Sequence, residues 1–280
     1  VVSVTGSRDP FYYSINAHYG ASDHEVFNDW GVQVPGVIMI TWPDNYYHTS
    51  GDRPEICDPT QLHRAIVLAA VSAYTIAEAG EEGAAKIASE VASNAAKRMA
   101  IKMKYDLSLL NEATAENFAQ LYRSARFNQD AMLKNETATL ATVMELAPAS
   151  AALKELVNTL QAGVKTTWTT NGKSIDAAMK IKASALGVAP IKSIVLTAEE
   201  KTASKVYPRS TAKVKEYGYG VLRSVPADVM AKYGFNKRGA VNHGGEIAKL
   251  TVGGTNSVLD IKKMLDAQFP NPDSLETITN

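Results

Sequence analysis

The segment Tyr46-Tyr47-His48-Thr49-Ser50-Gly51-Asp52 determines the fold predicted for the first part of this 280-residue chain. It follows the apolar run Val37–Trp42 and precedes Asp58-Pro59. The apolar run does not alternate with polar residues, which is typical of a strand buried on both faces. Asp58 as N-cap and Pro59 at the first helical position indicate a helix start. We therefore expect a strand, then a loop over 43–57, then a helix, with the loop at the carboxyl end of the strand, where α/β folds bind ligands.

Other signals in the first 80 residues fit this α/β prediction. Val1–Thr5 resembles a second buried strand, and Ser22 with Glu25 three positions later forms a capping-box pattern that predicts a short helix over 23–30. The helix after Asp58 should pack on the sheet and end at Gly80. Its packing face is predicted from apolar residues at helical spacing: Leu62, Ile66, Ala69, Ala70, Ala73 and Ala77.

After Gly80 the composition becomes helical, rich in Ala, Glu, Lys, Leu and Met. Periodicity predicts helices over 83–105, 112–146 and 149–163, arranged as an antiparallel layer or bundle. A turn over 168–173, a helix over 175–186 and an extended connector over 191–196 follow.

The last part of the chain has shorter helix signals, starting near Thr197, Pro226, Val258 and Asn271. Short helices between glycine turns resemble a small winged-helix-like module, broken off before its wing. We thus expect three parts: 1–80 as an α/β part, 81–190 as a helical region and 191–280 as the small module. The chain begins without Met and ends at a helix start, so we expect a fragment.

Composition excludes few functions. Lys+Arg and Asp+Glu both number 29, so net charge does not indicate nucleic acid or membrane as a partner. Residues 1–60 hold eight acidic and two basic side chains, which suits a cation site. Residues 160–240 hold fourteen basic and five acidic ones, without the interleaved aromatics that stack bases, so we expect a solvated surface. The sequence has no apolar run of membrane-spanning length.

The candidate catalytic chemistry centres on His48. None of the five histidines has a partner at the i, i+4 spacing of a helical zinc site, and the sequence lacks a phosphate-binding loop and a GxSxG motif. The lone Cys57 is expected to be a small buried residue. His48 follows a predicted strand, Asp52 can accept its second ring N–H, and Tyr47 can donate to a carbonyl oxygen. From the residues alone, a ligand role and an ordinary surface histidine both remain open.

A longer ordered pattern carries a family resemblance. It consists of Tyr19–His24, Phe27, Trp30-Gly31-Val32, Pro35-Gly36, the apolar run, Tyr47–Asp52 and Asp58-Pro59. This order of S-D-H, short helix, G-V-P, strand, H-T-x-x-D and D-P helix resembles the C-terminal half of the di-zinc aminopeptidases of peptidase family M28. The resemblance covers about residues 1–80.

The resemblance implies roles for individual residues. His48 matches the last zinc ligand, and Tyr47 matches a tyrosine that hydrogen-bonds the substrate carbonyl or tetrahedral intermediate. Tyr19 is the alternative for that tyrosine, because some members use one upstream of S-D-H. Asp23 and His24 match a motif that shapes the pocket wall.

The resemblance also implies two zinc ions in the intact parent, with four further ligands and a glutamate general base that all precede residue 1. Since this chain then holds one ligand of five, we expect the chain itself to be inactive. The implied substrate is a peptide or protein, and the implied location is exported, periplasmic or secreted. Nucleic acid is not an expected partner, and the oligomeric state stays open. Two alternatives remain: a glutaminyl-cyclase-like zinc acyltransferase, and a non-catalytic homologue that binds proteins.

Overall fold

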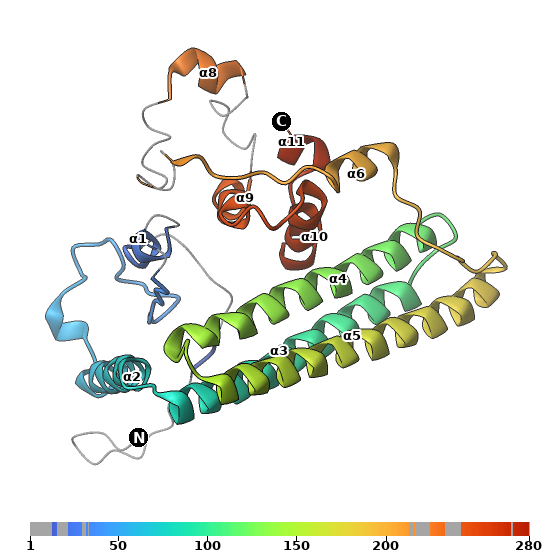
Figure 1. Ribbon diagram of the computed structural model, residues 1–280. Helices are drawn as coiled ribbons and strands as arrows, with labels where there is room; N and C mark the ends of the chain where they lie inside the picture. The colour runs from blue at the N-terminus through green and yellow to red at the C-terminus, as the bar shows by residue number, and fades with distance from the viewer. Residues whose placement is uncertain are drawn as a thin grey trace. The chain divides into compact units, whose positions relative to one another are not determined.

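The structure is a computed structural model that describes residues 13–15, 22–29, 32, 34–212, 216, 225–232, 242–269 and 271–279. Helices account for 68% of these residues, and no β-strand occurs among them. The chain divides into two compact units, Val1–Ala79 and Gly80–Asn280, each of which is described by itself (Figure 1). In the part of the chain that the structure describes, no helix is both long and apolar enough to cross a membrane.

The first unit contains α1 (His24–Asn28), the short 3-10 helix η1 (Pro54–Ile56) and α2 (Pro59–Ala77). The start of α2 confirms the prediction at Asp58, whose Oδ1 accepts hydrogen bonds from the backbone N–H groups of Thr60 and Gln61, at 2.8 and 3.3 Å. The capping box predicted at Ser22 does not form through side chains. There the Ser22 carbonyl accepts the N–H of Glu25 instead.

The predicted strand over 37–42 is wrong. This run is irregular, and the side chains of Val37 and Trp42 are 79% and 66% exposed. A strand is stable only beside other strands that pair with its backbone, and the described residues contain none. The predicted α/β fold class is therefore incorrect, since the described chain is all-α. The other predicted strand, Val1–Thr5, lies outside the described residues.

Because the described residues form no sheet, α2 does not have the packing partner that was predicted for it. The face predicted to pack is exposed, with Leu62 at 56% and Ile66 at 57%. The buried residue of α2 is Arg64, which lies on another side of the helix. Cys57, which was expected to be buried, is exposed.

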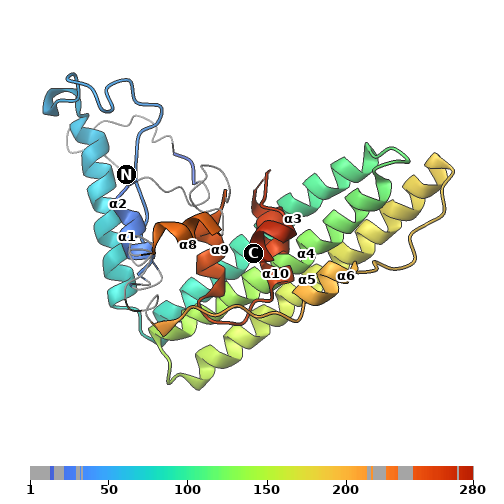
Figure 2. The same cartoon turned by 90° about the horizontal axis from the view of Figure 1, so that it is seen from above.

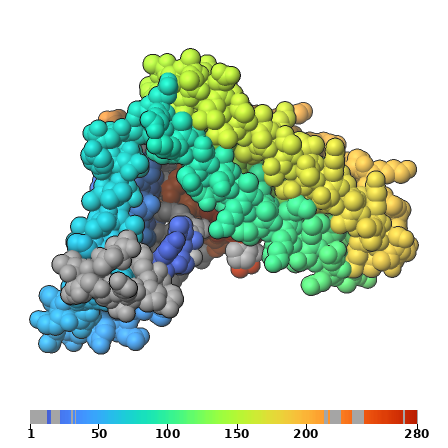
Figure 3. Space-filling model, turned by 90° about the horizontal axis from the view of Figure 1, so that it is seen from below, coloured from blue at the N-terminus to red at the C-terminus, as the bar shows by residue number. Residues whose placement is uncertain are grey.

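The second unit is built on three long helices, α3 (Glu81–Asn111), α4 (Phe118–Thr142) and α5 (Ala151–Leu186), with the 3-10 turn η2 (Val143–Leu146) between the last two. The predicted helical bundle is present: the three helices lie alongside one another in Figures 1 and 2, and Figure 3 shows the face where α3 and α5 meet. Three apolar clusters fill its interior. They are Ala84, Ala88, Val143, Leu153 and Val157 at one end; Ala95, Met99, Leu140 and Val164 in the middle; and Leu110, Ala113, Phe118, Tyr122, Ala125, Ile175, Met179 and Ala183 at the other end.

The turn predicted over 168–173 is wrong, because these residues continue α5 without interruption. Their polar and glycine composition disfavours a helix locally, but tertiary contacts outweigh it. Trp168 packs against the middle cluster, Asn171 is buried, and Gly172 lies under the Arg126 guanidinium, where a Cβ would be 2.7 Å from Nη1. The helix ends at Gly187, whose φ of 67° places it in the left-handed region that glycine tolerates.

Shorter helices follow the extended connector predicted over 191–196, which is confirmed as free of helix. They are α6 (Ala198–Ala203), α8 (Ala227–Lys232), α9 (Gly244–Thr251), α10 (Val258–Gln268) and α11 (Leu275–Thr279). Capping boxes start α6 at Thr197 and α10 at Ser257, because each cap exchanges two hydrogen bonds with the third residue of its helix. The winged-helix-like character of this region stays a prediction.

Candidate functional site

The loop that carries His48 is folded by its own polar side chains. Asp44 Oδ1 accepts the backbone N–H of Tyr46 at 2.8 Å. The carbonyl of Tyr46 then accepts both the N–H and the hydroxyl of Thr49, at 2.9 and 2.7 Å. The Thr49 hydroxyl oxygen in turn accepts the N–H of Gly51 at 3.1 Å. These contacts close a tight turn with His48 at its tip.

His48 has an unusual backbone conformation. Its φ is 58°, and it is the one non-glycine residue with positive φ in the described part of the chain. The left-handed region costs an L-residue on the order of 1–2 kcal/mol, although histidine enters it more often than most. Backbone conformations of this kind cluster at functional sites, where the surrounding hydrogen bonds maintain them.

The side chains around His48 form a short aromatic stack. Its imidazole lies on the ring of Tyr47, with 3.8 Å between centroids and 20° between planes. Trp42 meets the Tyr47 ring edge-on, with 5.7 Å between the two centroids. Tyr47 is 48% exposed and His48 is also exposed, so both polar tips reach solvent. The stack fixes the orientation of both rings and leaves them accessible to a ligand.

The structure brings some of the predicted site residues together and separates others. Tyr47 and His48 are in contact, whereas no hydrogen bond among the described residues joins the Asp52 carboxylate to His48; the Asp52 N–H instead bonds to the carbonyl of Thr49 at 3.2 Å. Asp23 occupies the N-cap position of α1 without a side-chain cap, and His24 is its first residue. Tyr19 lies outside the described residues.

A metal site is not assembled by the described residues. Among them, no group of three or more His, Cys, Asp or Glu side chains is placed to hold a metal ion. His48 offers one imidazole, and a structural or catalytic zinc needs three or four protein ligands. The described residues therefore do not make up a complete zinc site.

The sequence did not reveal the contact that holds the loop 34–36 to α1. Asn28 Nδ2 donates to the Gly36 carbonyl at 3.0 Å, and its Oδ1 accepts the Gly36 N–H at 2.7 Å. Val34 N–H also donates to the Phe27 carbonyl at 2.8 Å. A Cβ on Gly36 would be 2.7 Å from the His24 carbonyl oxygen, so only glycine allows this approach. In the sequence, Pro35-Gly36 indicates a turn, but nothing there identifies Asn28 as the residue that binds it.

The bundle contains a buried polar layer that the sequence also did not reveal. Asp106 on α3 accepts from Asn128 Nδ2 at 2.7 Å and faces Gln129 Nε2 at 3.4 Å. Gln129 Oε1 accepts from Asn171 Nδ2 of α5 at 3.0 Å, so all three helices contribute. Burial raises the pKa of Asp106 to about 6, against the opposing effects of the amide hydrogen bonds and of Lys102, whose Nζ lies 3.9 Å away. In the sequence, such a layer is indicated by polar residues at those positions of the helical repeat that face the core.

Two shallow hollows open on the second unit. One of about 390 Å³ lies between α3 and α5, with Met103, Leu107 and Asn171 on its walls. The other, of about 270 Å³, lies between α4 and the connector, beside Tyr122, Arg123 and Ile194. Neither brings together a nucleophile, an acid and a base, so the His48 loop remains the stronger candidate site.

Comparison with known proteins points to the same stretch. Residues 2–73 match Peptidase family M28, and the rest of the chain is a helical remainder outside the match. A search of curated proteins found no match. A search of solved structures also found none.

Proposed function

We propose that the first unit is part of a zinc-dependent aminopeptidase domain in which His48 supplies one metal ligand. The family match over residues 2–73 supports a peptidase ancestry and peptide substrates. The observation that carries the residue-level proposal is the left-handed backbone of His48 at the tip of a hydrogen-bonded turn. A strained conformation kept by several local hydrogen bonds is expected where the position of an imidazole matters.

The contact of Tyr47 with His48 supports a role for its phenol. A phenol next to a ligand imidazole can donate a hydrogen bond to a peptide carbonyl oxygen as negative charge develops there. The stacking at 3.8 Å keeps the Tyr47 ring beside the imidazole, which supports a shared role for the two groups. The exposure of Tyr47 leaves its hydroxyl available to a substrate.

Since the described residues supply a single ligand, the 280-residue chain is expected to bind zinc weakly and not to hydrolyse peptides. Calorimetric titration with zinc chloride tests the first expectation. His48→Ala should weaken binding at least about tenfold, because even residues that only orient a ligand contribute that much. His63→Ala on α2 is the matched control and should leave binding unchanged.

A hydrolysis assay with leucine 4-nitroanilide and added zinc tests the second expectation. No turnover is expected from the chain alone. Turnover that persists in His48→Ala would refute the role of His48. Where the same sequence occurs with a complete ligand set, His48→Ala should abolish turnover and Tyr47→Phe should lower kcat more than it raises KM.

A further inference from the structure

The C-terminal helices have an apolar core of their own. In the described residues from 196 to 279, here called the C-terminal module, Ala203 of α6 packs with Val258 and Leu259 of α10. Leu196, Leu275 and Ile278 complete this cluster. Among the described residues, none of the clusters of buried apolar side chains combines α4 of the bundle with α10 of the module. The module and the bundle thus each have an apolar cluster of their own, and α10 lies on α4.

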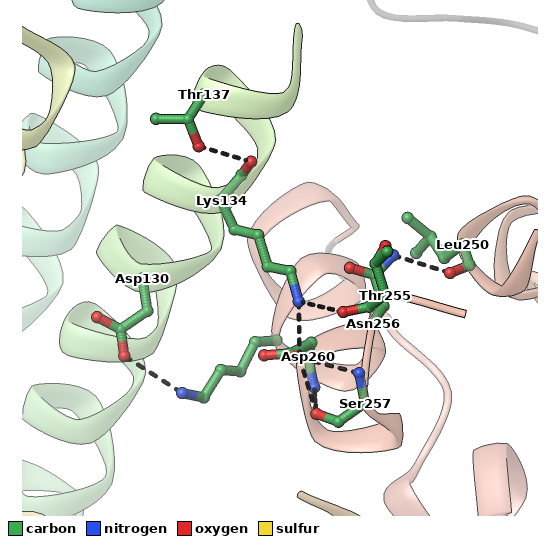
Figure 4. A network of polar contacts seen from close by, with 9 residues as sticks. Asp130, Lys134, Thr137, Leu250, Thr255, Asn256, Ser257 and Asp260 are labelled. Carbon is green, nitrogen blue, oxygen red and sulfur yellow. Dashed lines mark hydrogen bonds and ion pairs between the residues drawn. The ribbon is translucent and has the colours of Figure 1, made fainter. Parts of the chain in front are cut away.

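The contact between α4 and α10 includes a crossed pair of ion pairs, here called the charged seam (Figure 4). Lys134 of α4 contacts Asp260 of α10 at 2.8 Å and also donates to the Thr255 carbonyl at 3.1 Å. One turn away, Asp130 of α4 contacts Lys263 of α10 at 3.2 Å. Each helix thus presents one acidic and one basic residue to the opposite charges of the other.

Further contacts of charged side chains lie next to the charged seam, on an aromatic ring and on the connector. Lys263 Nζ lies 4.1 Å from the centroid of Phe127, and the Arg123 guanidinium lies 4.7 Å from the same ring. Arg123 also pairs with Glu200 of α6 and donates to the Val195 carbonyl at 2.9 Å. All of these polar contacts, like those of the charged seam, involve a lysine or an arginine.

The connector passes from one core to the other over two residues. Val188, Ile191 and Ile194 pack against the bundle cluster, while Leu196 packs in the module cluster. Val195, between them, is 68% exposed. A change of backbone angles at Val195 would move the module without disturbing either core.

We propose that the C-terminal module is a hinged unit, docked on α4 by the charged seam and released when the charges of the seam are screened or reversed. Interfaces inside a chain permit relative motion unless they are large and hydrophobic. The seam pairs are partly exposed, with side-chain exposures between 16% and 40%, so salt screens them. The buried apolar contacts inside each part are not screened in this way.

Distance measurements between paired spin labels test this proposal in the full chain. Cys57 is the only cysteine and is exposed, so Cys57→Ser gives a clean background. Labels at the exposed positions Ala138 on α4 and Glu276 on α11 report docking. Labels at Ala138 and the exposed Thr169 on α5 report the bundle alone.

At low salt we expect a narrow Ala138–Glu276 distance distribution. In about 1 M salt, where charges are screened beyond about 3 Å, or with Lys263→Glu or Lys134→Glu, it should broaden and move to longer distances while Ala138–Thr169 stays unchanged. The double variant Asp130→Lys with Lys263→Glu should restore the narrow distribution. Lys262→Glu, which removes a pair with Asp266 inside α10, should have no effect.

Two results would overturn the proposal. The first is an Ala138–Glu276 distance that responds neither to salt nor to charge reversal. The second is a simultaneous change of the Ala138–Thr169 distance, which would show that bundle and module unfold together.

Discussion

Asp106 of α3 accepts a hydrogen bond from Asn128 of α4, with 2.7 Å between Oδ1 and Nδ2, inside the bundle. Asp106 is 3% exposed and lies on α3 between residues of two apolar clusters. Burial favours the protonated carboxyl and outweighs the opposing effects of the amide donors and of Lys102, whose Nζ lies 3.9 Å away, so the pKa of Asp106 rises to about 6. The interior of this bundle is therefore sensitive to pH.

The free energy of unfolding should fall as pH rises from about 4 to about 6. The folded pKa of about 6 lies above the ordinary 3.8, so the folded state binds more protons in this window. The contribution is complete below about pH 4, is lost above about pH 6, and amounts to about 3 kcal/mol. Asp106→Asn should remove this dependence, as measured by thermal unfolding at about pH 4.5 and about pH 7, on either side of the folded pKa. If Asp106→Asn shows the same difference in Tm between the two pH values as the unsubstituted protein, the assignment is contradicted.

The pair formed by Arg98 and Glu136 gives a second prediction. The Glu136 side chain is fully buried and receives two hydrogen bonds from Arg98, at 2.7 and 2.6 Å, while Arg98 is half exposed. Arg98→Met should cost about 1–3 kcal/mol, because it leaves a buried carboxylate without its cation. Arg98→Met with Glu136→Leu should recover most of this loss in urea unfolding. If the double variant is less stable than the single one, burial of an unpaired charge is not the cause.

The Asn28–Gly36 contact predicts a local effect in the first unit. Gly36→Ala should cost about 1–3 kcal/mol, because the added Cβ meets the His24 carbonyl oxygen at 2.7 Å. Hydrogen exchange of the Val34 N–H, which bonds to Phe27, should accelerate. Gly80→Ala is the control, since no atom lies within 4 Å of the methyl group that it would add, and Val34 exchange should not change. Equal effects of both substitutions would show that the contact is not specific.

Helices were the part of the fold that the sequence predicted well. Alanine-rich periodic stretches identified the bundle, and Asp58 and Thr197 marked helix starts that form through local hydrogen bonds. Such signals are local, because a cap bonds to its own helix. The turn expected at 168–173 failed for the converse reason: Trp168 and Asn171 are held in α5 by contacts with other helices.

Features that depend on distant partners could not be predicted in this way. The apolar run at 37–42 has the composition of a buried strand, but strand formation requires neighbouring strands, and the described chain has none. The layer of Asp106, Asn128 and Asn171 depends on the register of three helices. At the candidate site, the sequence indicated His48 and Tyr47 but not their stacking or the left-handed backbone.

The most direct test of the proposed metal role is an NMR titration of the histidine side chains with zinc, observed through the imidazole nitrogens. The 280-residue chain has five histidines, so each signal can be assigned by single substitution. We predict that one nitrogen of His48 shifts first and that the signal is absent in His48→Ala. A titration in which His63 or His243 shifts while His48 stays unchanged would contradict the account.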